Sequence, residues 1–399
     1  MRNYSRITPE GTRDVLLKAC KIQRHVEMQL SEEFAHRGYH EVRTPGLEYF
    51  DLFQLPGAGI PQEEMYKTTD NAGQLVVFRP DSTLPIARMT AARLRNAAEP
   101  IRLFYNQPVY RNRPELSGRK NQIPQMGLEL LGAGGMKADL EILTMALDAL
   151  GSFGADFRLE IGHAGLFRAF ARRLPVSGAV REEIRDIIER KNYAALGEQL
   201  RGLEETDAVK AIGRLPRLFG DAAALAEAER YCVDAETEEI LSYLKALYQA
   251  LTELGYRDRI IVDLGLVQRK DYYSGVVFHA YLGHYGDVIL TGGRYDHLLE
   301  KFDAPMPAIG FSIDTEALTE GFSQDPGAPK TRCSIVHWGS GFAARGHALM
   351  KERIAQGESC ISSLFDRLED CIAYGKSLGV DMIYVVSETV REIEMGGEG

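Results

Sequence analysis

The 399-residue sequence has only five cysteines, and none of them lies in a Cys-x-x-Cys pair. An odd number of widely spaced cysteines argues against a disulfide framework and against a structural zinc site, and it favours a reducing compartment. The N-terminus lacks the apolar segment of a signal peptide, and nowhere do about eighteen apolar residues run together. We therefore expect a cytoplasmic protein that does not cross a membrane.

Positive charge and the common nucleotide and metal motifs are also scarce. There are 47 basic against 57 acidic residues, which gives a net charge of −10 at pH 7. Such a field repels a phosphate backbone, so nucleic acid is not the expected partner. Gly-x-Gly-x-x-Gly, P-loop and His-Glu-x-x-His patterns are absent. His163, His279, His284 and His297 lack the spacing of metal ligands, and we expect neither a metal nor a cofactor.

Hydrophobic periodicity predicts a helix near the N-terminus, followed by strands. Apolar residues recur every four positions from Ile22 to Phe34 and Gly38 follows, which predicts an amphipathic helix over residues 16–37. A second helical pattern covers residues 138–150. Short apolar runs predict strands at residues 75–78, 101–105, 157–161, 260–264, 276–278 and 288–290. We expect the later strands to continue an antiparallel sheet.

Composition divides the chain into regions. From Ala179 to Gly255 the sequence is rich in Ala, Leu and Glu, which predicts a helical insertion at about residues 178–255. Residues 323–331 contain Pro326-Gly327-Ala328-Pro329 and form the clearest linker, so we expect a main domain over residues 1–322. Beyond the linker, a strand-helix-strand-helix-strand pattern predicts a small α/β domain over residues 332–399.

Four segments combine charged residues and glycines on predicted core strands, where an unpaired charge is costly. They are residues 78–83, residues 110–113 with 125–129, residues 266–273 and residues 291–296. Any one of them alone is explained by an internal ion pair or a solvated strand edge. Together they indicate a polar pocket.

In order and spacing these segments resemble the histidyl-tRNA synthetase family, which has the class II aminoacyl-tRNA synthetase fold. Residues 79–83 are similar to the family's Arg-Pro-Glu-Gly-Thr strand, and residues 110–113 to its motif 2. Residues 266–273 resemble the histidine signature Leu-Val-Arg-Gly-Leu-Asp-Tyr-Tyr, residues 292–296 match the second signature, and residues 307–311 resemble the start of motif 3. The resemblance implies an α+β fold, with an antiparallel sheet flanked by helices.

The sequence departs from that pattern at three positions that handle ATP in the family. Gln268 replaces a catalytic arginine, Ala317 replaces the arginine that clamps the γ-phosphate, and Arg113 replaces a glutamate that contacts adenine. No Lys or Arg occurs from Phe302 to Phe322 to replace the missing clamp. Because each lost charge-assisted contact costs about 10²- to 10³-fold in rate, we expect amino-acid activation to be lost and no catalytic residue to remain.

The histidine-facing positions are better preserved. The resemblance implies a histidine site made of Asp81, Thr83, Arg111, Gln125, Glu129, Gln268, Tyr272 and Tyr273. In it, Asp81, Thr83 and Gln125 meet the α-amino group. Arg111 meets the carboxylate, where Gln268 removes one positive charge. Glu129 and the two tyrosines meet the imidazole.

A pocket that keeps amino-acid contacts and loses nucleotide contacts indicates a sensor. This pattern resembles the regulatory subunits of ATP phosphoribosyltransferase, which are synthetase paralogues. The resemblance implies a non-catalytic protein required for the first step of histidine biosynthesis and for feedback inhibition by histidine. It also implies a short-form catalytic subunit as partner, and a dimer formed through the N-terminal helix and strand.

The alternatives are an active histidyl-tRNA synthetase, a histidine-dependent aminoacyl transferase, and a scaffold that binds no ligand. The arginine losses argue against the two enzymes. So does the C-terminal domain, which resembles an anticodon-binding domain only in its β-α-β-α-β core and ends at Gly399 before that domain would be complete. We therefore do not expect tRNA as a partner. Calorimetry with histidine separates a sensor from a scaffold.

Overall fold

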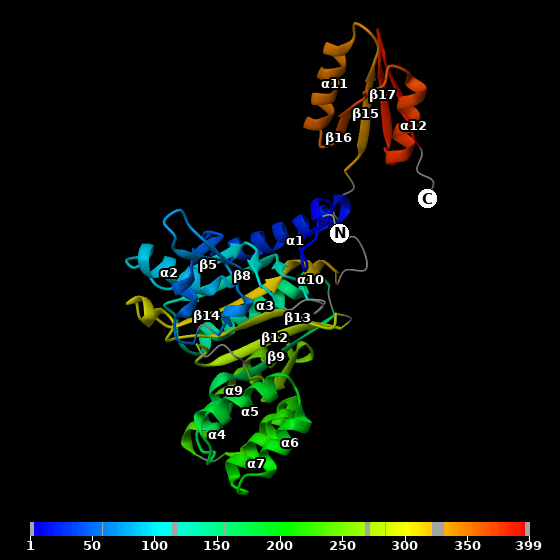
Figure 1. Cartoon of the computed structure of the whole chain (residues 1–399). Helices are drawn as coiled ribbons and strands as arrows, with labels where there is room; N and C mark the ends of the chain where they lie inside the picture. Colours follow the sequence, from blue (N-terminus) through cyan, green and yellow to red (C-terminus); the bar gives the residue numbers. More distant parts are fainter. Residues whose placement is uncertain are drawn as a thin grey trace. The chain divides into compact units, whose positions relative to one another are not determined.

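The structure, a computed structural model, describes residues 4–57, 59–113, 119–154, 156–232, 234–267, 272–283, 285–320 and 331–395. The chain divides into two units, Met1–Pro326 and Gly327–Gly399. Each unit has its own sheet and its own hydrophobic core (Figure 1).

A nine-stranded sheet forms the centre of the first unit, in the order β1-β5-β8-β14-β13-β12-β9-β11-β10. The strands in that order are His40–Glu41, Ile101–Asn106, Gln125–Leu131, Ala308–Asp314, Val288–Arg294, Val276–Leu282, Phe157–His163, Ile260–Asp263 and Phe219–Gly220. From β5 to β9 every neighbouring pair is antiparallel, as predicted. However, β1 pairs with β5, and β11 with β9, in parallel. The sheet is therefore mixed towards its edges.

Helices α1 (Leu17–His36) and α3 (Gly135–Gly151) cover one face of this sheet. The four-residue repeat of α1 buries Val26, Leu30 and Phe34 completely, which confirms the predicted helix. Gly38 follows with φ +84°, a conformation that glycine adopts without strain. The buried faces of α1 and α3 pack in one hydrophobic cluster with strand residues that include Phe104, Leu128 and Phe311.

The opposite face of the sheet is partly covered by α2 (Thr83–Arg93) and a three-stranded sheet in the order β2-β4-β3. These strands are Leu47–Tyr49, Leu75–Phe78 and Lys67–Thr69, and a separate pair joins β6 (Val109–Tyr110) to β7 (Gln122–Ile123). The helix α10 (Thr315–Glu320) follows β14 directly. The cavity described below opens on this second face.

The segment predicted to be helical lies between β9 and β11 (Figure 1). Its helices are α5 (Gly178–Glu189), α6 (Tyr193–Arg201), α7 (Asp207–Arg214), α8 (Ala222–Ala228) and α9 (Ala235–Glu253). A further helix, α4 (Ala164–Ala171), precedes the predicted segment in the same connection. Polar side chains cap the N-terminus of each helix: His163, Ser177, Asn192, Thr206, Asp221 and Asp234. The short strand β10 was not predicted. Parallel strands need a long crossover connection, and this segment provides one between β9 and β11.

The second unit contains β15 (Cys333–Trp338), α11 (Ala343–Ala355), β16 (Ser359–Ser362), α12 (Leu368–Leu378), β17 (Met382–Val386) and β18 (Val390–Glu394). The predicted strand and helix alternation is confirmed, and α11 and α12 lie on opposite faces of the sheet (Figure 1). The edge strand β18 was missed, because three of its five residues are charged. Apart from Thr331, the predicted linker lies outside the described residues. Among the described helices, none is long and apolar enough to cross a membrane.

Two ion pairs connect α3 to the sheet and differ in burial. The Arg294 guanidinium on β13 pairs with Asp139, and the two side chains are 7% and 1% exposed. Arg102 on β5 pairs with Glu141 at 2.8 Å, and both side chains are 32% exposed. Breaking a buried pair leaves an uncompensated charge, whereas an exposed charge is solvated by water.

We therefore expect Arg294→Met to lower the free energy of unfolding by about 3–5 kcal/mol. The matched change Arg102→Met should lower it by about 1 kcal/mol or less. Urea unfolding of both variants at pH 7 provides the comparison. Equal losses would show that the Arg294 pair is not a main attachment of α3 to the sheet.

Candidate functional site

The strand β8 presents its two faces to different surroundings. Met126, Leu128 and Leu130 point into the hydrophobic core beneath α1 and α3. Because successive side chains of a strand point to opposite faces, Gln125 and Glu129 lie together on the other face. They line a cavity of about 370 Å³.

The cavity brings together seven of the eight residues predicted from the sequence. They are Asp81, Thr83, Arg111, Gln125, Glu129, Tyr272 and Tyr273. The eighth, Gln268, lies outside the described residues. The seven residues come from segments that are far apart in the chain and meet only in the folded structure.

Glu129 lies at the inner end of the cavity, and its residue is 1% exposed. Its carboxylate accepts a hydrogen bond from the hydroxyl of Tyr295. Gly310 lies directly opposite on β14, and a Cβ atom there would overlap the Glu129 carboxylate. Burial, followed by the charge of Glu129, raises the pKa of Tyr295 well above its usual value, so Tyr295 remains a proton donor.

Tyr295 was missed as a pocket residue, although it belongs to the Gly-Gly-Arg-Tyr-Asp segment found in the sequence. The edge of its ring faces Tyr272, with ring centroids 5.9 Å apart and an interplanar angle of 77°. The rings of Tyr272 and Tyr273 are 4.9 Å apart. A Cβ atom on Gly293 would lie 2.6 Å from the Tyr273 ring, so this aromatic wall requires glycine there.

Asp81 is tied to the start of α2. It is 7% exposed, and its Oδ1 accepts the backbone N–H groups of Thr83 at 2.9 Å and Leu84 at 3.2 Å. These bonds fix the carboxylate, and with it Thr83, at the rim of the cavity. On the neighbouring wall, the amide oxygen of Gln125 accepts a hydrogen bond from Tyr105 at 3.4 Å.

Positive charges gather at another part of the cavity wall, where Arg111, Arg113 and Arg119 lie close to one another. Burial lowers the pKa of Arg113, and the charges of Arg111 and Arg119 lower it further. The Arg111 guanidinium lies 3.9 Å from the Glu64 carboxylate, which is a weak ion pair. This region favours an anionic group such as a carboxylate.

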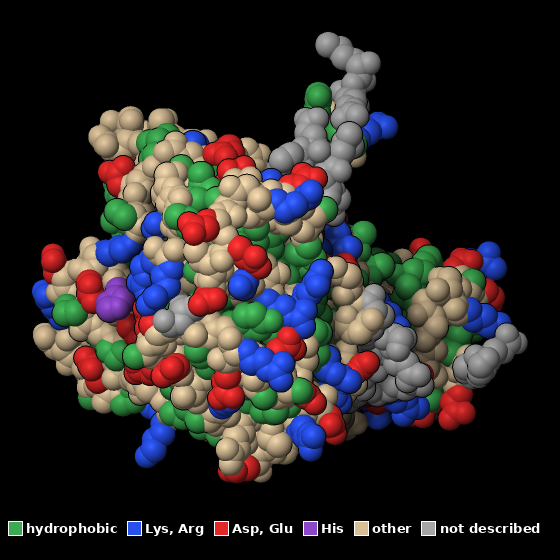
Figure 2. All heavy atoms as spheres, turned by 90° about the horizontal axis from the view of Figure 1, so that it is seen from below, with side chains coloured by type: hydrophobic (Ala, Val, Ile, Leu, Met, Phe, Trp, Pro, Cys, Tyr) green, Lys and Arg blue, Asp and Glu red, His purple; other side chains and the backbone are tan. Residues whose placement is uncertain are grey.

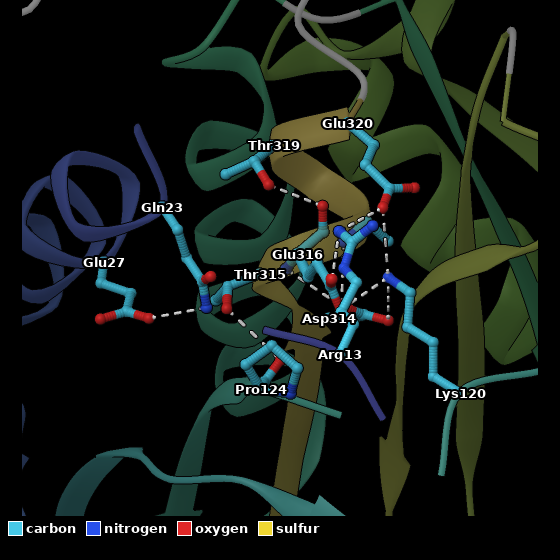
Figure 3. Close-up of polar contacts among 11 residues, drawn as sticks. Arg13, Gln23, Glu27, Lys120, Pro124, Asp314, Thr315, Glu316, Thr319 and Glu320 are labelled. Atoms are coloured by element: carbon cyan, nitrogen blue, oxygen red, sulfur yellow. Dashed lines mark hydrogen bonds and ion pairs between the residues drawn. The ribbon is translucent and has the colours of Figure 1, made fainter. Parts of the chain in front are cut away.

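Lys120 lies beside these arginines, but carboxylates of the same chain surround it (Figure 3). Its Nζ is 3.0 Å from Glu316 and 3.8 Å from both Asp314 and Glu320. Arg13 from the N-terminal segment pairs with Glu316 and Glu320 as well. The sequence shows no basic residue near Ala317 in the chain. It did not predict these ion pairs, because Arg13 and Lys120 are far from Glu316 in the sequence.

Ala317 is completely buried in α10. Asp314 precedes the helix and accepts the backbone N–H groups of Glu316 at 3.0 Å and Ala317 at 2.9 Å. Burial raises the pKa of Asp314, although the nearby charge of Lys120 opposes this rise. The position of the expected clamp thus holds a small buried side chain beside carboxylates.

The described histidines do not form a metal site, and no group of three or more metal-ligating side chains occurs in the described part of the chain. His163 accepts the N–H of Gly165 at the start of α4. Burial lowers the pKa of His163 to about 4, with a further contribution from Arg168. His297 pairs with Glu300 at the surface.

The chain is similar to several known proteins. A family model described as histidyl-tRNA synthetase matches residues 11–318. The ATP phosphoribosyltransferase regulatory subunit of Clostridium botulinum (strain Langeland / NCTC 10281 / Type F) is 31% identical over 389 residues, covering 96% of this chain and 92% of the relative. The protein of the same name from Bacillus mycoides (strain KBAB4) is 33% identical over 401 residues, covering 98% and 94%.

A solved structure is also similar over most of its length. The crystal structure described as an ATP phosphoribosyltransferase regulatory subunit/histidyl-tRNA synthetase from Bacillus halodurans C is 28% identical, with a TM-score of 0.84. The match covers 94% of this chain and 97% of that chain. The class II aminoacyl-tRNA synthetase-like fold is thereby confirmed.

The contact between Gly310 and Glu129 predicts that Gly310→Ala is poorly tolerated. The new Cβ atom would lie 2.8 Å from the Glu129 Cδ and closer still to the Leu128 carbonyl. We expect a loss of about 1–3 kcal/mol in the free energy of unfolding. Gly134→Ala is the matched control, since the nearest atom to its Cβ is 3.7 Å away. Denaturant unfolding that gave both variants the same stability would contradict the close contact.

Proposed function

Because the chain belongs to the histidyl-tRNA synthetase-like family of ATP phosphoribosyltransferase regulatory subunits, we propose that it regulates that enzyme without being catalytic itself. Its partner is the short-form catalytic subunit, which depends on it in the first step of histidine biosynthesis. Histidine is the effector that inhibits the complex. It can do so only if it binds one quaternary state better than another.

The observation that supports this proposal most strongly is the charge layout of the cavity. Arg111 lies in the positively charged region and Glu129 at the buried end. A histidine molecule matches this layout, with its carboxylate towards Arg111 and an imidazole N–H donated to Glu129. Asp81, Thr83 and Gln125 line the same cavity and would face the α-amino group, and the tyrosine rings would pack around the imidazole.

Three features support the loss of ATP-dependent activation. Lys120 and Arg13 are neutralised by Glu316 and its neighbours. Ala317 offers no charge, and Asp287 and Asp314 line the cavity. A triphosphate placed beside α10 would meet the carboxylates of Asp314 and Glu316. Like charges repel strongly in a partly buried site.

Acidic and basic side chains are intermixed over the face shown in Figure 2. A phosphate backbone binds most favourably where positive charge dominates a surface. This layout supports a protein partner and a small effector in preference to tRNA.

Self-association is part of the proposal, and an apolar surface supports it. On the β2-β4-β3 sheet, Leu47 pairs with Phe78, and these side chains are 47% and 41% exposed. Tyr49 on the same strand face is 59% exposed, and Leu16 and Leu17 are exposed at the start of α1. Exposed apolar patches mark association surfaces, and we assign the patch of Leu47, Tyr49 and Phe78 to a second copy of the chain.

The first test is ATP–pyrophosphate exchange with histidine. We expect none, because Gln268, Ala317 and Arg113 replace the groups that would handle ATP. Restoring one group with Gln268→Arg should not rescue exchange, since the γ-phosphate clamp remains absent. Exchange at about 1 s⁻¹ or faster would instead identify an active synthetase.

Mixing with a short catalytic subunit should give phosphoribosyl transfer that depends on this chain.

The second test is calorimetric binding of histidine, with an expected Kd of about 10–100 μM. Glu129→Ala should weaken binding by about 1.5–3 kcal/mol, the usual range for a hydrogen bond to a charged group. The inhibitory concentration of histidine in the mixed complex should rise by a similar factor. Glu129→Gln keeps the shape of the side chain and should also weaken histidine binding.

The control for this test is Glu141→Ala, which removes an equal charge from the opposite side of the sheet, where Glu141 pairs with Arg102. It should leave the Kd unchanged. If Glu129→Ala binds histidine like the unaltered chain, the effector site lies elsewhere.

A further inference from the structure

A second cavity, of about 360 Å³, lies between the helical insertion and the far part of the sheet. The insertion and its connections contribute Ile188, Glu189, Lys191 and Tyr193, and the sheet contributes Asp263, His279 and Tyr281. Arg111, Arg113 and Val288 line both this cavity and the first one. The proposed histidine site does not use the remaining residues.

A buried carboxylate that does not itself line this second cavity lies next to a residue that does, His279. Glu160 on β9 is directly opposite His279 on β12, and partners of an antiparallel pair point to the same face. Glu160 is nine-tenths buried, and its Oε2 has no hydrogen-bond partner among the described residues. Buried polar atoms are almost always hydrogen-bonded, so this oxygen indicates a missing donor.

A second carboxylate lies nearby. Asp263 ends the neighbouring strand β11 and lies on the same face, two residues after the partner of Glu160. Its Oδ1 accepts the N–H of Gly265 at 2.9 Å. Burial raises the pKa of both carboxyl groups, and for Glu160 the charge of Asp263 is the next cause. Two close carboxylates therefore share a partly buried region.

The exposed residue Lys191 lines the cavity, and its positive charge favours the ionised form of both carboxyl groups. Its Nζ lies 5.9 Å from the centre of the Tyr281 ring. Among the described residues, neither Glu160 nor Asp263 forms an ion pair. The arrangement already places one ammonium group over an aromatic face, and it leaves both carboxylates without a direct cationic partner.

We propose that this second cavity binds an organic ammonium group, which donates hydrogen bonds to Glu160 and Asp263 and packs against the rings of Tyr281 and Tyr193. A primary ammonium supplies the donor that Glu160 Oε2 lacks. It also reduces the repulsion between the two carboxylates, and it gains cation–π attraction from the tyrosines. The ammonium belongs either to a free amine or to a lysine side chain of another protein.

The test is calorimetric titration of the full chain with 1,5-diaminopentane, using pentane-1,5-diol as the uncharged control. We expect saturable binding of the diamine and none of the diol. Tighter binding of N-acetyl-lysine amide than of the diamine would assign the site to a protein side chain, and the reverse order would assign it to a free amine. Absence of saturable binding by both amines would overturn the proposal.

Charge-matched variants locate the binding. Glu160→Gln should weaken diamine binding by about 10- to 100-fold, as expected for losing a charge-assisted hydrogen bond. Glu198→Gln on α6 removes the same charge from an exposed position outside this cavity and should have little effect. Glu129→Gln, in the first cavity, should also leave diamine binding unchanged. Weakening by Glu129→Gln but not by Glu160→Gln would place the amine in the first cavity and overturn the proposal.

A variant that is expected to strengthen diamine binding distinguishes loss of the site from misfolding. Lys191→Ala removes the competing ammonium from an exposed position and should tighten diamine binding by about two- to fivefold. A general loss of structure would not strengthen binding. Unchanged or weaker binding in Lys191→Ala would count against the proposed site. Histidine binding tests the first cavity separately, so either proposal can fail alone.

Discussion

The burial of Glu129 on an inner strand of the sheet is the constraint on which the site depends. A carboxylate removed from water costs several kcal/mol unless donors compensate it. Here Tyr295 donates to it and Gly310 leaves room for it on the adjacent strand. Tyr272 then packs against Tyr295, so one buried charge fixes both the shape and the polarity of the inner end of the cavity.

The alternation of side chains on β8 allows one strand to serve both stability and the site. Leu128 and its neighbours are buried beneath α1 and α3, while Glu129 points the opposite way. Arg294 and Asp139 hold β13 to α3 from within the protein. Tyr295 directly follows Arg294, so this ion pair also restricts where the donor to Glu129 can lie. Packing on one face of the sheet therefore positions groups on the other.

Local sequence patterns predicted the features that depend on interactions between residues close in the chain. The period of α1 follows from Val26, Leu30 and Phe34, and the alternation in the second unit from short apolar runs. The parallel pairing of β11 was beyond such patterns, because strand direction is set by the path of the whole insertion. The ion pair between Arg13 and Glu316 could not be predicted from local patterns either, since these residues are neighbours only after folding. Polar segments on core strands still indicated the pocket, because charge there needs compensation.

The two cavities differ in how their charges are compensated, and two arginines line both of them. In the first cavity, Lys120 is neutralised by carboxylates of the same chain. In the second, Glu160 and Asp263 form no ion pair among the described residues, whereas Arg111 and Arg113 line both spaces. A cation that binds near Glu160 changes the field at these arginines, and a carboxylate at Arg111 changes it in return. Such coupling is reciprocal, so each ligand would alter the affinity of the other by the same factor.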